Sequence, residues 1–158
     1  MLARTIRTVC AALAILLASA GTALAAAGGC HTYSGDFTAV APADCDSPFG
    51  ICTHGTLVGG FPSTYDFSVD TLDAFGNYTG HSTITSEQGA LIFGSDSGTL
   101  VPQPDGTATF VTTVQIVGGT RQYAHATGTF VAPGTLDLAT GNTVGTYSAT
   151  VCLGVGSD

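Results

Sequence analysis

Four side chains in the body of the chain have the chemistry to hold or act on a small molecule. Arg121 could clamp a carboxylate through its planar guanidinium, and Glu87, the one glutamate, would be a general-base candidate if it were buried. Tyr123 and His125 alternate along one stretch and could face either side of a strand. The structural alternatives are turn positions for Arg121 and Glu87 and packing for Tyr123. The sequence therefore predicts these four residues as ligand-binding candidates and identifies no catalytic residue.

Patterns typical of metal, nucleophile or phosphate chemistry do not occur in the sequence. The four histidines are scattered, and no H-x-H, H-x-x-x-H or C-x-x-C spacing indicates a metal site. The sequence also contains no G-x-S-x-G elbow and no glycine loop that leads into a helix. We therefore expect no metal and no cofactor, and the residues leave open whether the protein is an enzyme.

The balance of charge excludes two classes of partner. The 158 residues include three basic and eleven acidic ones. Removal of the first 27 residues would leave Arg121 as the one cation against eleven acids, a formal net charge of −10. Binding to nucleic acid requires several lysines or arginines to neutralise phosphates, so nucleic acid is not expected as a partner. An anionic membrane surface is disfavoured on the same ground.

The first 27 residues have the three parts of an export signal. Arg4 and Arg7 form a basic region, an apolar stretch follows at 9–20, and small residues offer cleavage near Ala25 or Ala27. We expect a signal peptide at 1–27 and a secreted, extracellular domain at 28–158 with no membrane attachment. The alternatives are a membrane anchor, since 9–27 is uncharged, and a lipid anchor on Cys30.

The cysteines support export to an oxidising compartment. Cys10 would leave with the signal, and an even number would remain: Cys30, Cys45, Cys52 and Cys152. Four cysteines allow three pairings. The favoured pairing joins Cys45 to Cys52 across a turn-rich segment and Cys30 to Cys152 at the two ends of the domain. Small exported domains commonly depend on such cross-links.

Hydrophobic alternation with period two predicts an all-β domain after residue 27. In one run Tyr65, Phe67 and Val69 share a face opposite Asp66 and Ser68. Turn signals rich in glycine, proline and asparagine separate the runs. Eight strands are expected at 35–40, 52–58, 64–72, 77–86, 90–95, 107–117, 123–131 and 143–152.

The short connections favour a closed eight-stranded antiparallel β-barrel, mostly a meander of hairpins. Closure removes the exposed edges that an open sheet would leave. The interior of such a barrel is either filled by side chains or holds one small ligand. The alternative architecture is a sandwich of two sheets.

One segment resembles a known family. The stretch Val117-Gly-Gly-Thr-Arg-Gln-Tyr-Ala-His-Ala-Thr-Gly-Thr129 is similar to the V-G-G-T-G-x-[F/Y]-x-x-A-x-G-x segment of the allene oxide cyclase and dirigent barrels and of their bacterial secreted relatives. Arg121 departs from the glycine that is common in the family. The resemblance implies a barrel with a mostly apolar cavity that controls the stereochemistry of ring closure or radical coupling, and it transfers no catalytic residue.

Two functions follow from these observations. The first is a secreted barrel that binds or cyclises a small apolar molecule in its interior, which predicts an apolar cavity with one or two polar groups. The second is a non-catalytic extracellular structural or interaction module whose barrel is plugged by side chains. The ligand and the oligomeric state cannot be deduced from the sequence.

Overall fold

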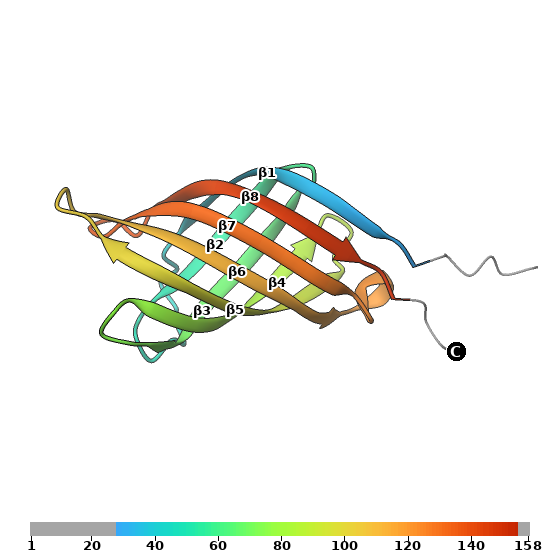
Figure 1. Cartoon of the computed structure of the whole chain (residues 1–158), viewed down its shortest axis with the longest axis horizontal. Coiled ribbons are helices and arrows are strands. Elements are labelled where there is room, and N and C mark those ends of the chain that lie inside the picture. The colour runs from blue at the N-terminus through green and yellow to red at the C-terminus, as the bar shows by residue number, and fades with distance from the viewer. Residues whose placement is uncertain (1–27, 155–158) are drawn as a thin grey trace, which may run out of the picture.

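The structure, a computed structural model, describes residues 28–154. Each strand pairs antiparallel with the next along the chain, and the last pairs with the first, so the sheet closes into a barrel (Figure 1). The expected eight-stranded antiparallel meander is therefore confirmed, and the two-sheet sandwich is not found. The strands are β1 (Cys30–Val40), β2 (Cys52–Gly59), β3 (Ser63–Leu72), β4 (Asn77–Ser86), β5 (Leu91–Pro102), β6 (Thr107–Gly119), β7 (Thr127–Asp137) and β8 (Thr143–Cys152).

The alternating sequence pattern places the side chains as expected. On β3, Tyr65, Phe67 and Val69 point to the buried side, whereas Asp66 and Asp70 are exposed. On β6, Ala108, Thr112, Val114 and Ile116 are buried in the same way. Because side chains in a strand alternate between faces, the inward set of every strand meets in one core inside the barrel.

Three strands have a boundary that differs by more than two residues from the one expected. β1 begins at Cys30 rather than at 35, because pairing with β8 extends to Cys152. β5 continues to Pro102 rather than ending at 95, because β4 and β6 pair with it throughout. The expected strand at 123–131 is β7, which begins at Thr127 and reaches Asp137.

The segment before β7 is a short 3₁₀ helix, η1 (Arg121–Tyr123), and not a strand. Gly118 (φ 134°) and Arg121 (φ 53°) both have positive φ, which turns the backbone out of the extended conformation. His125 therefore lies in a turn, although the sequence analysis placed it in a strand.

Glycines inside the barrel make room for aromatic rings on the neighbouring strands. A Cβ atom added to any of these glycines would collide with the facing ring. Removing the side chain at one position thus lets a large ring lie across it, which fills the interior without expanding the barrel. The facing pairs are Gly35 with Tyr147, Gly145 with Phe37, Gly55 with Tyr65, Gly98 with Tyr78, and Gly134 with Phe110.

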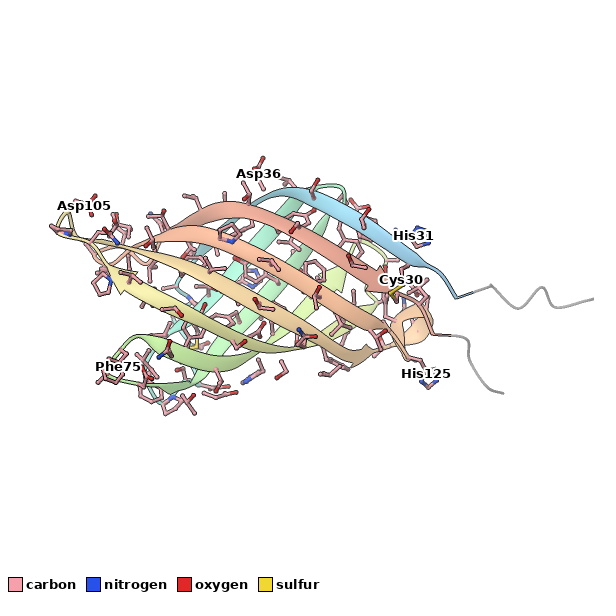
Figure 2. The ribbon with its side chains drawn as sticks, viewed as in Figure 1. Cys30, His31, Asp36, Phe75, Asp105 and His125 are labelled. Atoms are coloured by element: carbon pink, nitrogen blue, oxygen red, sulfur yellow. A yellow bond between two sulfur atoms is a disulfide. The ribbon has the colours of Figure 1, made fainter. Side chains whose placement is uncertain are left out.

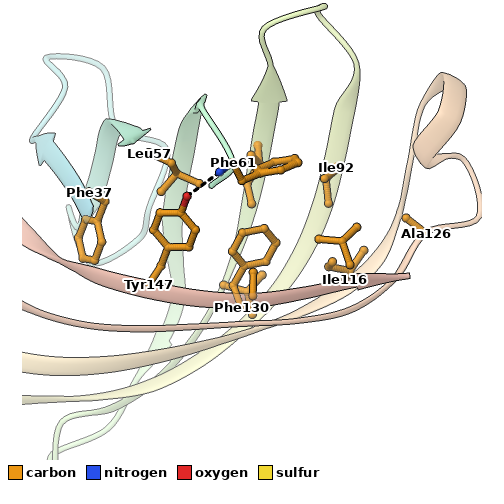
Figure 3. Packing of buried hydrophobic residues seen from close by; sticks show 12 residues of the cluster. Phe37, Leu57, Phe61, Ile92, Ile116, Ala126, Phe130 and Tyr147 are labelled. Atoms are coloured by element: carbon orange, nitrogen blue, oxygen red, sulfur yellow. Dashed lines mark hydrogen bonds between the residues drawn. The ribbon is translucent and has the colours of Figure 1, made fainter. Parts of the chain in front are cut away.

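Both ends of the described chain, the turns at 60–62 and 87–90, and η1 lie at one end of the barrel (Figure 1). Side chains fill the interior at this end, which we call the plugged end. Phe61 folds inward from the β2–β3 turn, and its backbone N–H donates to the Tyr147 hydroxyl at 2.9 Å (Figure 3). Phe130, Ile92 and Ile116 pack around it and are almost fully buried. The plug therefore depends on one inward-pointing turn residue.

The opposite end, which we call the cavity end, carries the loop at 41–51 and the turns at 73–76, 103–106 and 138–142. Figure 2 shows Phe75 and Asp105 at this end and His31 and His125 at the plugged end. In each of the three turns an aspartate accepts hydrogen bonds from backbone N–H groups. Hydrogen bonds from the side chains of Asn77 and Thr107 are the main cause that lowers the pKa of Asp73 and Asp105, and the backbone bonds add to it. For Asp137 the backbone bonds are the main cause of its lowered pKa.

Both expected disulfides are present. Cys30–Cys152 joins β1 to β8 at directly paired positions, where the sheet closes on itself. Cys45–Cys52 ties the long β1–β2 loop to the start of β2. The expected signal peptide, 1–27, lies outside the described residues. Across 28–154 no helix is long and apolar enough to span a membrane.

Candidate ligand-binding site

A cavity of about 110 Å³ occupies the barrel interior between the plug and the cavity end. Phe130 and Tyr147, which belong to the plug, form its floor. Ile51, Leu72, Leu100 and Leu136 lie at its rim and are half-buried. The walls between floor and rim are mainly aromatic and aliphatic, and they include Phe37, Tyr65, Phe67, Val69, Tyr78, Ile84, Phe110, Val114 and Ala132.

One carboxyl group interrupts this apolar wall. Asp96 lies on β5 and points inward with only 2% of its surface exposed. Its Oδ1 accepts a hydrogen bond of 3.2 Å from the Ser82 hydroxyl on β4. Its Oδ2 is buried and has no hydrogen-bond partner in the described part of the chain. Buried polar atoms are rarely left without a partner, so this oxygen needs an explanation.

The position of Asp96 follows from the period of its strand. Counting by two along β5 gives Ile92, Gly94, Asp96, Gly98 and Leu100, all on the inward face. The two glycines make room for side chains of the neighbouring strands: Val114 and Ser82 lie against Gly94, and the Tyr78 ring lies across Gly98. The strand thus presents a carboxyl group to the cavity and keeps it from solvent.

Burial raises the pKa of Asp96 to about 6. Desolvation of the charged form is the main cause of this rise. The hydrogen bond from Ser82 and the interaction with His81 lower the pKa of Asp96, and the charge on Asp70 raises it further. His81 and Asp70 pair with each other on the outer face of the barrel, at 2.9 Å. The Asp96 carboxyl is thus mostly ionised at pH 7.5 and mostly protonated at pH 5.

A tyrosine and a threonine stand beside this carboxyl group. The Tyr78 ring lies across Gly98, and its hydroxyl forms a hydrogen bond with the Thr112 hydroxyl on β6. Burial is the main factor that raises the pKa of Tyr78, and the charge on Asp96 acts in the same direction. Burial likewise raises the pKa of Tyr65 to about 12. Both phenols therefore stay neutral, and Asp96 is the one group of the cavity wall that changes charge near neutral pH.

Comparison with known proteins does not name a family. No protein-family model matches the chain, and no curated protein matches it. Among solved structures, the chain is similar to the pterocarpan synthase dirigent protein GePTS1, with 13% sequence identity over 83% of this chain and 88% of that chain and a TM-score of 0.36. A likeness at this level does not place the chain in a family. The resemblance to allene oxide cyclase and dirigent barrels stays a prediction, whereas the closed barrel that it implied is confirmed.

The four candidates from the sequence lie at the plugged end, and none of them lines the cavity. Arg121 is exposed, and its guanidinium donates to the Gln88 carbonyl at 2.6 Å, which ties η1 to the β4–β5 turn. Glu87 and His125 are exposed, and the half-buried ring of Tyr123 packs against Phe61 with ring centres 6.2 Å apart. Contact between these four residues and a ligand stays a prediction.

Asp96 is not among the residues predicted from the sequence, because the expected strand ends at 95. Glycines at two inward positions of β5 interrupt the apolar alternation, so the pattern fades just before the carboxyl group. The spacing of Ile92, Asp96 and Leu100 could have identified this residue. In a strand these three positions share one face, so the acid lies on the same face as two apolar residues. A charged residue in phase with a buried face indicates a functional position more strongly than one in a turn.

Acidic and histidine side chains also pair on the outer face of the barrel. His54 and Asp66 on β2 and β3 approach to 2.6 Å, and both are well exposed, as are His81 and Asp70. In residues 28–154 no group of three histidine, cysteine, aspartate or glutamate side chains is placed to hold a metal ion. These pairs are surface interactions on strands whose other face forms the barrel interior.

Proposed function

We propose that this barrel binds a small, mostly apolar molecule in the cavity, with Asp96 as the polar group that orients it. The observation that carries the proposal is the buried, unpartnered Asp96 Oδ2 in a mostly apolar wall, whose other polar side chains carry only hydroxyl groups, such as those of Thr53 and Thr143. A pocket of this kind, apolar with a few placed polar groups, is the usual form of a small-molecule site. A structural barrel would gain stability from an apolar residue at this position.

The size of the cavity limits the ligand. Its volume of about 110 Å³ compares with the engineered cavity of about 150 Å³ that accepts benzene. A single ring is about the limit of what this space encloses, and a substituent or a longer molecule would extend towards Leu100 and Leu136 at the rim. The alternative function, a plugged structural module, is supported by the packing around Phe61, but that packing fills the plugged end.

Proton transfer to the bound molecule is a second candidate function. The pKa of Asp96, about 6, lets its carboxyl group both accept and donate a proton near neutral pH. This favours an acid–base step on a molecule held in the cavity. Export to an oxidising compartment belongs to the same proposal, and the two disulfides support it.

A pair of variants on β7 tests the binding site. Ala132 lines the cavity, whereas the neighbouring Val131 points outward and is exposed. We expect toluene to shift NMR signals of cavity residues in the native protein and in Val131→Phe. In Ala132→Phe the new ring fills the cavity and the shifts disappear, with thermal melts showing that both variants are folded. Equal toluene binding by the two variants, or none by the native protein, would contradict the proposal.

A further inference from the structure

We infer that the molecule held in the cavity is an apolar amine, and that Asp96 pairs with its protonated nitrogen. This inference rests on the proposed function and names the class of ligand. Its basis is the geometry of Asp96: the carboxyl group is 2% exposed, Oδ1 is bound to Ser82, and Oδ2 has no partner in residues 28–154. An ionised carboxylate accepts hydrogen bonds and cannot donate them, so its missing partner must be a donor.

A cationic donor suits this oxygen better than a neutral one. Ionised groups form shorter and stronger hydrogen bonds with opposite charges, and the effect grows in a water-poor cavity. Within residues 28–154 no lysine or arginine is placed to supply such a cation. Arg121 is the one lysine or arginine in the described part of the chain, and it is bound to Gln88 at the plugged end. A cation that completes the Asp96 pair must therefore come with the ligand.

The cavity wall is also suited to a cation. Aromatic ring faces attract ammonium groups, and the attraction strengthens where water is excluded. A protonated nitrogen at Oδ2 would lie in a cavity whose wall carries several aromatic rings, and the apolar part of the ligand would contact those rings and the aliphatic rim. The rings that line the cavity belong to Phe37, Tyr65, Phe67, Tyr78, Phe110 and Phe130.

The charge around the entrance acts in the same direction. Asp44 and Asp46 lie in the loop at 41–51, and Asp73 and Asp105 lie in turns at the cavity end, as does Asp137 at the end of β7. Negative potential at a cleft mouth raises the local concentration of cations and repels anions. An amine is therefore attracted to this end of the barrel, whereas a carboxylate ligand is disfavoured twice, at the rim and at Asp96.

The test compares ligands of one shape and different charge. Benzylamine is a cation at neutral pH, benzyl alcohol is a neutral donor, and benzoate is an anion. We expect the native protein at pH 7.5 to bind benzylamine at least tenfold more tightly than benzyl alcohol, with no detectable benzoate binding, as measured by NMR titration. The preference falls to near one in Asp96→Asn and is kept in Asp36→Asn, a matched change at an exposed carboxyl group on β1.

A pH series on the unmodified protein makes the test independent of the folding of a variant. Benzylamine affinity should fall up to tenfold per pH unit below pH 6, because protonated Asp96 loses its charge, whereas benzyl alcohol affinity stays constant. The titratable groups around Asp96 are Tyr78 in the cavity, and His81 and Asp70 on the outer faces of β4 and β3. The inward face of β6 opposite Asp96 contributes Thr112 and Val114, which do not titrate. The variant Asp96→Asn lacks the carboxyl group but keeps His81 and Asp70. We therefore expect its benzylamine affinity to stay constant across the pH series.

The outcomes separate this inference from the proposed function. Benzyl alcohol binding as tightly as benzylamine, or a preference for benzylamine that survives in Asp96→Asn, overturns the amine assignment and leaves the cavity as a site for neutral apolar molecules. If none of the three compounds binds and toluene does not bind either, both the assignment and the proposed function are wrong.

Discussion

At the scale of single residues, Asp96 is placed where it lowers stability. A carboxyl group whose pKa rises on folding binds protons more tightly in the folded state, so the stability of the protein falls as the pH rises. For Asp96 this loss develops between about pH 4 and pH 6 and is complete above pH 6. The turn aspartates Asp73, Asp105 and Asp137 have the opposite effect, because their lowered pKa adds stability that is lost on acidification.

The variant Asp96→Asn separates these opposing effects. It removes the buried charge and keeps an oxygen that can accept from Ser82, so we expect it to raise the free energy of unfolding at pH 7.5. The upper limit is about 3 kcal/mol, the free energy that corresponds to a pKa raised to about 6. The gain should shrink towards pH 4, where both proteins are neutral at this position. Urea unfolding at the two pH values measures it, and a less stable variant at pH 7.5 would refute this account of Asp96.

At the scale of elements, the sequence predicts the strands well where apolar residues alternate without interruption. β4 and β8 have the expected bounds, and the inward faces of β3 and β6 are the expected ones. The prediction is less accurate where the cause is not local. The first part of β1 is held by pairing to β8, and β5 continues through two inward glycines that make room for side chains of the neighbouring strands. Neither cause can be recognised from the alternation of apolar and polar residues along a single strand.

The two disulfides should differ in their effect, because they close loops of very different length. Cys30–Cys152 spans 122 residues and Cys45–Cys52 spans 7. From loop-closure entropy, replacing the first pair by serine should lower the free energy of unfolding by about 5 kcal/mol, and replacing the second by roughly 2–3 kcal/mol. Urea unfolding of the two double variants measures the difference. An equal loss, or a larger loss for the second pair, would show that closure of the barrel does not depend on the β1–β8 cross-link.

At the scale of the whole molecule, the barrel divides into a packed half and a hollow half. Phe61 and its neighbours fill the end that carries η1, and the cavity begins where that packing stops. The sequence offered a filled barrel and a ligand-holding barrel as alternatives, and the structure contains a part of each. The sequence alone does not predict where the packed half ends. That boundary depends on Phe61, a turn residue that folds inward and contacts Tyr147 on a strand far away in the sequence.

The central claim is that a small molecule binds in the hollow half and contacts Asp96. The most direct test is to measure intermolecular NOEs between bound benzylamine, or toluene if the amine does not bind, and the side chains of the native protein. We predict NOEs to the methyl groups of Val114 and Ala132, which both line the cavity. NOEs confined to Tyr123 and His125 at the plugged end would contradict the account.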